Sequence, residues 1–190
     1  MEEINQEIKT CLGVLQRGGL ILYPTDTVWG IGCDATNEIA VSKIFKLKKR
    51  ELSTSLLILL DHEGKLLSYV KEVPEAAWDL IEFSKKPLTI VYDSAKNLAK
   101  NVIAKDGTVG IRITRDEFCK RLIEKFRKPI VSTSANISGA PVPANFKSVD
   151  PELITGVDYV VNLRQHEKAN ATPSTIIRLK VNGEFKMIRK

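Results

Sequence analysis

Four hydroxyls and a carboxamide are concentrated in residues 132–139 (Ser-Thr-Ser-Ala-Asn-Ile-Ser-Gly), directly after the apolar run 129–131. Such side chains rarely build a core, because each brings hydrogen-bonding groups that need partners. Two interpretations are open. The segment either forms a polar cradle for a ligand, or forms a turn in which Ser, Asn and Gly residues bond their own backbone. Alone, the segment favours neither.

Residues 48–50 (Lys-Lys-Arg) gather cations at the expected end of a helix that Asn37 can cap. Lys48 and Arg50 could project toward a triphosphate, Arg50 as a bidentate fork and Lys48 as a point charge. The helix dipole also favours cations at a helix C-terminus, where they face water. For this segment taken alone, the second explanation is the stronger.

Three further segments place polar groups at strand ends. Residues 23–30 (Tyr-Pro-Thr-Asp-Thr-Val-Trp-Gly) could bind an amino acid or a sugar, although a capped turn explains them slightly better. Arg112 ends the apolar strand that begins at Thr108, and it needs either a ligand's anionic group or a carboxylate of the protein. Residues 173–175 (Pro-Ser-Thr) open another strand, and Arg189 is the penultimate residue.

The sequence offers few residues for dinucleotide, histidine-based or metal chemistry. Residues 30–35 (Gly-Ile-Gly-Cys-Asp-Ala) fit a dinucleotide pattern, but no helix is expected to start at these glycines, so the pattern is rejected. The two histidines do not support a histidine-based site. Cys11, Cys33 and Cys119 lie far apart, which fits a reducing cytosol and argues against a zinc site or a disulfide framework.

The composition is that of a globular α/β domain: 190 residues, 43% hydrophobic and 27% charged. No apolar run approaches the ~20 residues of a membrane span, and the acidic start lacks a secretory leader's apolar core. A net charge of +6 allows either nucleic-acid binding or binding of a small polyanion. We therefore expect one domain over residues 1–190, in the cytoplasm and without a membrane partner.

Hydrophobic periodicity predicts a mixed sheet flanked by helices. Helices are expected at residues 4–15, 37–49, 74–84, 116–126 and 151–155. Strands are expected at 20–23, 56–60, 88–92, 108–113, 130–131, 159–163, 175–179 and 185–188, the last two joined by a hairpin turn at Asn182-Gly183.

Taken together, these segments resemble one family. A K-x-R pair (Lys48, Arg50) followed far downstream by S-x-N (Ser134, Asn136) is the hallmark of the YrdC/Sua5 family, the threonylcarbamoyl-AMP synthases. The Pro-Thr-Asp-Thr-Val loop, the Gly-Ile-Arg strand end and the Pro-Ser-Thr segment occur in the family's order. The resemblance covers residues 18–189 and implies the short, single-domain type with the YrdC/RibB-like fold.

The resemblance implies an enzyme that condenses L-threonine, bicarbonate or CO2 and ATP into threonylcarbamoyl-adenylate and pyrophosphate. The product supplies the t6A modification of tRNA. Mg²⁺ is expected to arrive with ATP, without a dedicated protein metal site. Contacts with tRNA and with the threonylcarbamoyl transferase machinery are further expectations. The alternative is a module that binds double-stranded RNA or tRNA without catalysis.

The resemblance also implies roles for individual residues. No general acid or base is expected; Lys48, Arg50, Ser134 and Asn136 are expected to position the reactants. Threonine is expected to contact Thr27, Arg112, Ser134 and Ser174. ATP is expected to contact Lys48, Arg50, Thr54, Thr108, Ser132, Asn136 and Arg189. The chain departs from the family pattern at Trp29, Glu51, Thr54 and Val142, which leaves individual nucleotide contacts open.

Overall fold

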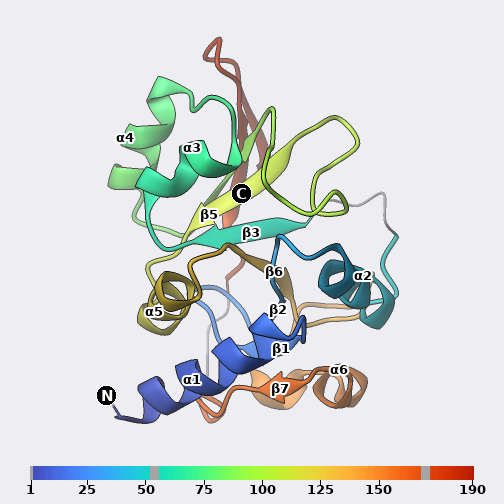
Figure 1. Ribbon diagram of the computed structural model, residues 1–190. Helices are drawn as coiled ribbons and strands as arrows, with labels where there is room; N and C mark the ends of the chain where they lie inside the picture. Colours follow the sequence, from blue (N-terminus) through green and yellow to red (C-terminus); the bar gives the residue numbers. More distant parts are fainter. Residues whose placement is uncertain (1, 52–55, 168–171) are drawn as a thin grey trace.

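The computed structural model describes residues 2–51, 56–167 and 172–190. Within them, one mixed sheet has the strand order β7-β1-β2-β6-β3-β5-β4-β8-β9 (Figure 1). Parallel pairs (β1 with β7, β3 with β5, β4 with β8) occur among antiparallel ones. The predicted α/β fold with a mixed sheet flanked by helices is confirmed.

The strands are β1 Ile21–Tyr23, β2 Gly30–Gly32, β3 Leu57–Leu60, β4 Leu88–Tyr92, β5 Val109–Ile113, β6 Ile130–Ser134, β7 Tyr159–Val160, β8 Thr175–Leu179 and β9 Phe185–Arg189. The helices are α1 Glu2–Gln16, α2 Glu38–Leu47, α3 Leu66–Tyr69, α4 Glu75–Phe83, α5 Glu117–Phe126 and α6 Pro151–Gly156, with 3₁₀ turns η1 Glu63–Lys65 and η2 Phe146–Ser148. In Figure 1 the β8–β9 hairpin, in red, extends away at the top of the view.

The helix starts follow from side-chain caps. Asn37 Oδ1 accepts hydrogen bonds from the backbone N–H groups of Ile39 and Ala40, so the predicted cap of α2 is confirmed. Asp116 Oδ1 accepts from the N–H of Cys119 at 2.9 Å and starts α5 in the same way. These caps satisfy N–H groups that have no partner inside the helix.

Strand β2 was not predicted, because its glycines carry no hydrophobic signal. Gly32 shows why glycine is needed there: an added Cβ would lie 2.7 Å from both Tyr23 Cε1 and the Val131 carbonyl oxygen. Helix α3 and the turns η1 and η2 were not predicted either, and the ends of two strands differ from the prediction by three residues. β6 runs on to Ser134, because Ser132 and Thr133 continue the strand beyond the apolar pair, and β7 stops at Val160.

The two faces of the sheet carry separate cores. Helices α1 and α5 pack on β1, β3 and β6 through residues such as Ile8, Phe118 and Leu59. The opposite face packs against α2, α3, α4 and α6. Because side chains alternate along a strand, Leu57 shares a face with Leu59, and Leu57 pairs with Gly110 of β5. The face that carries α1 and α5 therefore continues onto β5 and β4, beyond the core that those helices form.

A candidate ligand-binding cleft

A cleft of about 270 Å³ opens on that continuation of the sheet. Its polar and charged walls hold seven of the residues that the resemblance singled out: Thr27, Arg50, Arg112, Ser132, Ser134, Ser174 and Arg189. Among the described lining residues there are three arginines and no Asp or Glu. The cleft is therefore suited to a small anionic ligand.

A second hollow of about 480 Å³ is lined by Lys48, Arg50, Ser134 and Asn136, together with Lys49, Glu51, Ser138 and Gly139. Arg50 and Ser134 line both spaces, so the two adjoin. Burial lowers the pKa of Arg50 from its usual value. The K-x-R and S-x-N residues, far apart in sequence, thus meet around one hollow.

The K-x-R segment forms the end of α2. The Arg50 N–H donates to the Phe45 carbonyl at 2.9 Å, and the Lys49 N–H donates to the Lys46 carbonyl at 3.2 Å. Lys49 has a φ of 51°, in the left-handed region. This pattern is a Schellman motif. Its reversal of the chain sends Lys48 inward, while the Lys49 ammonium pairs with Glu152 at the surface.

The Lys48 side chain is only 1% exposed. Its Nζ donates to the backbone carbonyls of Ser134 and Asn136, and the Ser138 N–H donates back to the Lys48 carbonyl at 3.0 Å. Burial, and secondarily the charge of Arg50, lower the pKa of Lys48 to about 8. Lys48 therefore holds the loop after β6 to the end of α2, besides lining the hollow.

The side chains of Ser134 and Asn136 bond each other and their own loop. Ser134 Oγ donates to Asn136 Oδ1 at 2.6 Å. Asn136 Nδ2 donates to the carbonyls of Ile137 and Ala140. The loop therefore has the self-bonded character of a turn. Because its proton is used in this way, the Ser134 hydroxyl presents acceptor lone pairs to the cleft.

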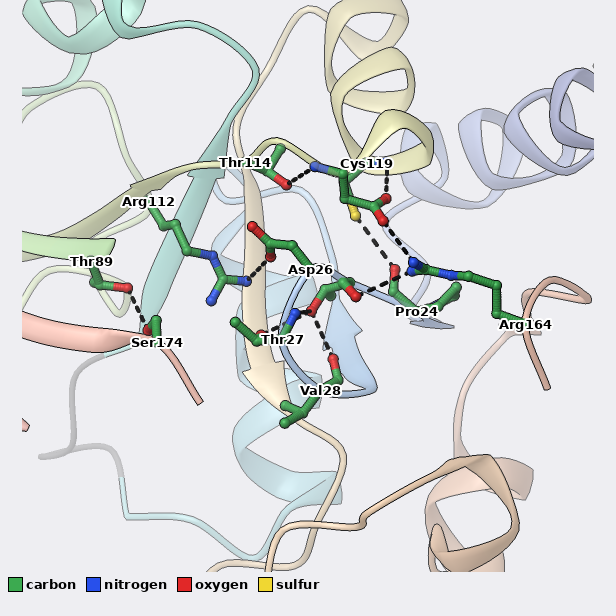
Figure 2. Close-up of polar contacts among 12 residues, drawn as sticks. Pro24, Asp26, Thr27, Val28, Thr89, Arg112, Thr114, Cys119, Arg164 and Ser174 are labelled. Carbon is green, nitrogen blue, oxygen red and sulfur yellow. Dashed lines mark hydrogen bonds and ion pairs between the residues drawn. The ribbon is translucent and has the colours of Figure 1, made fainter. Parts of the chain in front are cut away.

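The loop between β1 and β2 fixes the hydroxyl of Thr27. Thr25 Oγ1 donates its single proton to the Val28 carbonyl at 2.8 Å. It must then accept from the Thr27 N–H and from the Thr27 hydroxyl, both 3.0 Å away (Figure 2). Thr27 Oγ1 is thereby left as an acceptor. An acceptor on the cleft wall suits an ammonium, amine or hydroxyl of a ligand.

The loop between β1 and β2 is also held by contacts with α5 and with Arg164. Arg164 donates to the Thr25 carbonyl and pairs with Asp116, the cap of α5, and the Cys119 thiol donates to the Pro24 carbonyl (Figure 2). These contacts connect α5 and the segment after β7 to the loop that carries Thr27.

Arg112 extends from β5 toward Asp26, with its Nη2 3.1 Å from Asp26 Oδ1. The alternatives for Arg112 were a ligand or an acidic residue of the protein, and the structure shows an ion pair with Asp26. Figure 2 shows the guanidinium between this loop and the Thr89–Ser174 pair. Arg112 lines the cleft as well, so the internal pairing does not remove it from the site.

Ser174 is almost completely buried and joins two elements. Its Oγ lies 2.9 Å from Thr89 Oγ1, and its carbonyl accepts from Nε and Nη2 of Arg189 at 3.0 and 2.8 Å. Burial, and secondarily the charge of Arg112, lower the pKa of Arg189. Sequence reasoning missed Thr89, although a hydroxyl inside the apolar strand 88–92 is a signal that could have indicated it.

The predicted ATP contact Thr108 lines neither the cleft nor the adjoining hollow. The Thr108 hydroxyl donates to Asp106 at 2.7 Å. Thr54 lies outside the described residues. Of the departures from the family pattern, Val142 lines the cleft and Glu51 lines the hollow. Trp29 packs on Phe146, with ring centroids 4.8 Å apart, in the core.

Groups of metal-ligating side chains and membrane-spanning helices are both absent from the described part of the chain. There, no group of three or more His, Cys, Asp or Glu side chains is arranged to hold a metal ion. None of the helices within the described ranges combines the length and apolar character that crossing a membrane requires.

The sheet and the cleft together define an α/β protein with a cleft whose described lining includes three arginines and no Asp or Glu. The family model Sua5_yciO_yrdC, described as "Telomere recombination", matches residues 13–190. The chain belongs to this Sua5/YciO/YrdC family. It is 33% identical over 172 residues to the threonylcarbamoyl-AMP synthase of Pseudoalteromonas translucida, which covers 89% of this chain and 91% of the relative.

Solved structures agree with this assignment. A structure of Pyrococcus abyssi Sua5 with two substitutions has a TM-score of 0.83 at 32% identity, covering 91% of this chain and 53% of that one. P. abyssi Sua5 complexed with L-threonine has a TM-score of 0.80 at 30% identity, covering 90% and 50%. The chain therefore spans about half the length of the P. abyssi protein. Escherichia coli YciO, at 20% identity and a TM-score of 0.83, shares the fold.

Proposed function

We propose that this chain is an L-threonylcarbamoyladenylate synthase, an enzyme of the nucleotidyltransferase class. The observation that supports this most is the cleft, which gathers Thr27, Arg112, Ser134 and Ser174, expected at threonine, with Arg50, Ser132 and Arg189, expected at ATP. Relatives of similar length carry that activity in their names, and a related structure holds L-threonine. A cytoplasmic location, where ATP and tRNA are available, is part of the same proposal.

The polarity of the cleft orients the amino acid. Arg112 provides N–H donors for the carboxylate, whereas Thr27 Oγ1 provides an acceptor for the amine. With its carboxylate on Arg112, the amino acid can present its amine to CO2 near Thr27. The amine then adds to CO2 and forms a carbamate with loss of a proton.

The next step joins the carbamate to the nucleotide. A carbamate oxygen attacks the α-phosphorus of ATP, and the bond to pyrophosphate breaks. This step depends on positioning and on neutralising charge. Arg50 and Arg189, with Lys48 in the adjoining hollow, provide cations for the phosphates. In this proposal Mg²⁺ arrives as part of the MgATP substrate.

The direct test is mass spectrometry of the products after incubation of the purified chain with MgATP, L-threonine and bicarbonate. We expect threonylcarbamoyl-adenylate and one pyrophosphate per adenylate, with neither formed when any one substrate is omitted. Absence of the adenylate under saturating substrates would contradict the proposal. Pyrophosphate release without threonine would indicate a different reaction.

A further inference from the structure

Asp26 lies between Thr25 and Thr27, and its carboxylate reaches across to Arg112 of β5 (Figure 2). The two side chains are 14% and 4% exposed, and Oδ1 of Asp26 lies 3.1 Å from Nη2 of Arg112. A guanidinium keeps its charge inside a protein, so a buried one needs an opposite charge nearby. Within the described residues, Arg112 forms its ion pair with Asp26.

The ion pair occupies only part of the guanidinium. Its contact with Asp26 is an ion pair without a hydrogen bond, since Asp26 Oδ1 and the buried Nε of Arg112 both have no hydrogen-bond partner among the described residues. Arg112 lines the cleft, whereas Asp26 is not part of that lining. Asp26 therefore pairs with the guanidinium from outside the cleft lining, and N–H groups that make no contact with Asp26 remain as donors for a group that enters the cleft.

The neighbouring charges explain why such a pairing is needed. Arg112 and Arg189 both line the cleft, and the charge of Arg112 contributes to lowering the pKa of Arg189. Two like charges in one cleft repel each other. With Asp26 removed, that repulsion would favour orientations in which Arg112 points away from the space where a ligand carboxylate would bind.

We propose that Asp26 is a positioning residue, which fixes the Arg112 guanidinium so that its remaining N–H donors receive the carboxylate of the amino-acid substrate. The inference rests on the proposed function, since it requires an amino acid in the cleft. It adds to that function a residue that determines affinity for the carboxylate without touching it.

The first experiment measures binding by calorimetry, which does not depend on turnover. Asp26→Asn removes the charge and nearly keeps the shape. We expect it to weaken L-threonine binding about tenfold or more. ATP binding should stay within about twofold of wild type, because ATP has no contact that Asp26 orients. Asp61→Asn is the matched control, since Asp61 is also a buried carboxylate, paired with Lys65 at 2.7 Å outside the cleft.

L-threoninol, in which an alcohol replaces the carboxylate, separates the roles that Asp26 could have. If Asp26 acts through Arg112, Asp26→Asn leaves L-threoninol binding unchanged. An equal loss for both ligands would mean that Asp26 binds the ammonium or supports the loop, and would overturn the proposal. The double variant Asp26→Asn/Arg112→Met should bind L-threonine no more weakly than Arg112→Met alone, since Asp26 acts through the charge of Arg112, which methionine lacks.

A measurement on the wild-type chain keeps the proposal testable if Asp26→Asn does not fold. The Arg112 Nε–H resonance, assigned by its loss in Arg112→Lys, should shift on addition of L-threonine and stay in place with L-threoninol. If the Arg112 Nε–H resonance does not shift when L-threonine is added, the inference is refuted, while the synthase activity stays possible. A wild-type chain that binds no L-threonine would refute both.

Discussion

Replacing Lys48 by methionine should destabilise the fold, because the Lys48 amine joins the end of α2 to the loop after β6. Its Nζ donates to the carbonyls of Ser134 and Asn136. The Ser134 carbonyl keeps another donor, the Asn136 N–H at 2.9 Å, but no second donor to the Asn136 carbonyl is seen among the described residues. A hydrogen bond from a charged group contributes about 1.5–3 kcal/mol, and a buried carbonyl left without a donor costs about 1–3 kcal/mol. We therefore expect Lys48→Met to lower the free energy of unfolding by about 2–4 kcal/mol at pH 7.

The same substitution has a pH dependence of defined sign. The pKa of Lys48 is lowered to about 8 from an ordinary 10.5, so between these values the unfolded chain binds the proton more tightly than the folded chain. Stability contributed by Lys48 therefore rises with pH across this window. The neutral amine still has two N–H donors for the two carbonyls. By linkage, the gap between wild type and Lys48→Met should be about 1 kcal/mol larger at pH 9 than at pH 7.

The assay is urea unfolding of both chains at pH 7 and pH 9, followed by circular dichroism. Lys49→Met is the matched control. Lys49 belongs to the same segment but has an exposed ammonium, and its replacement should leave the pH dependence at the wild-type level. A Lys48→Met chain within about 0.5 kcal/mol of wild type at both pH values would refute the reasoning, since that is the behaviour of a surface lysine. A gap that narrows at pH 9 would refute the pH argument alone.

Three further substitutions test the fold and the walls of the cleft, each measured by urea unfolding. Gly32→Ala should lower the free energy of unfolding by about 1–3 kcal/mol, because the added Cβ would collide with Tyr23 and the Val131 carbonyl. A variant as stable as wild type would show that β1, β2 and β6 can move apart without loss of stability. Thr89→Val should lower the free energy of unfolding by about 1 kcal/mol, because it removes the hydrogen bond to Ser174. An unchanged midpoint of urea unfolding would contradict a stabilising role for that bond. Asp116→Ala should lower the free energy of unfolding by about 1–2 kcal/mol, because α5 loses its N-terminal cap. Asp116→Asn should keep most of that stability, because the Asn side-chain oxygen can accept the same hydrogen bond.

The fold was largely predictable because its signals are local. The α2 cap at Asn37 and the apolar run of β3 depend on neighbouring residues, and both are present where the sequence indicated. Strand β2 was missed for a physical reason. Its glycines are required by the close approach of β1 and β6, which are separated from each other by about a hundred residues of chain. No local pattern carries that requirement.

The cleft was predictable as a set of residues and less so as a set of contacts. The family resemblance indicated Thr27, Arg112 and Ser174, but it could not show that Thr25 orients the Thr27 hydroxyl or that Asp26 pairs with Arg112. Those relations depend on the tertiary arrangement of the β1–β2 loop and β5. Thr108 shows the converse, since a hydroxyl at a suitable position in the sequence is bonded to Asp106 instead.

The contact between Lys48 and residues 134–136 bears on the polar segment after β6, for which the sequence left a turn and a ligand cradle open. The loop is a turn, since the Asn136 side-chain amide donates to the carbonyls of Ile137 and Ala140 within the same loop. It also lines the cleft and the hollow, and two of its backbone carbonyls accept hydrogen bonds from the buried Lys48 amine at the end of α2. The side chains of Ser134 and Asn136 hold the turn in shape. The backbone carbonyls of the same two residues accept hydrogen bonds from the Lys48 amine. The position of the cation is therefore specified by the shape of the loop. Any substitution that reshapes the turn should move Lys48 and the adjoining Arg50 together.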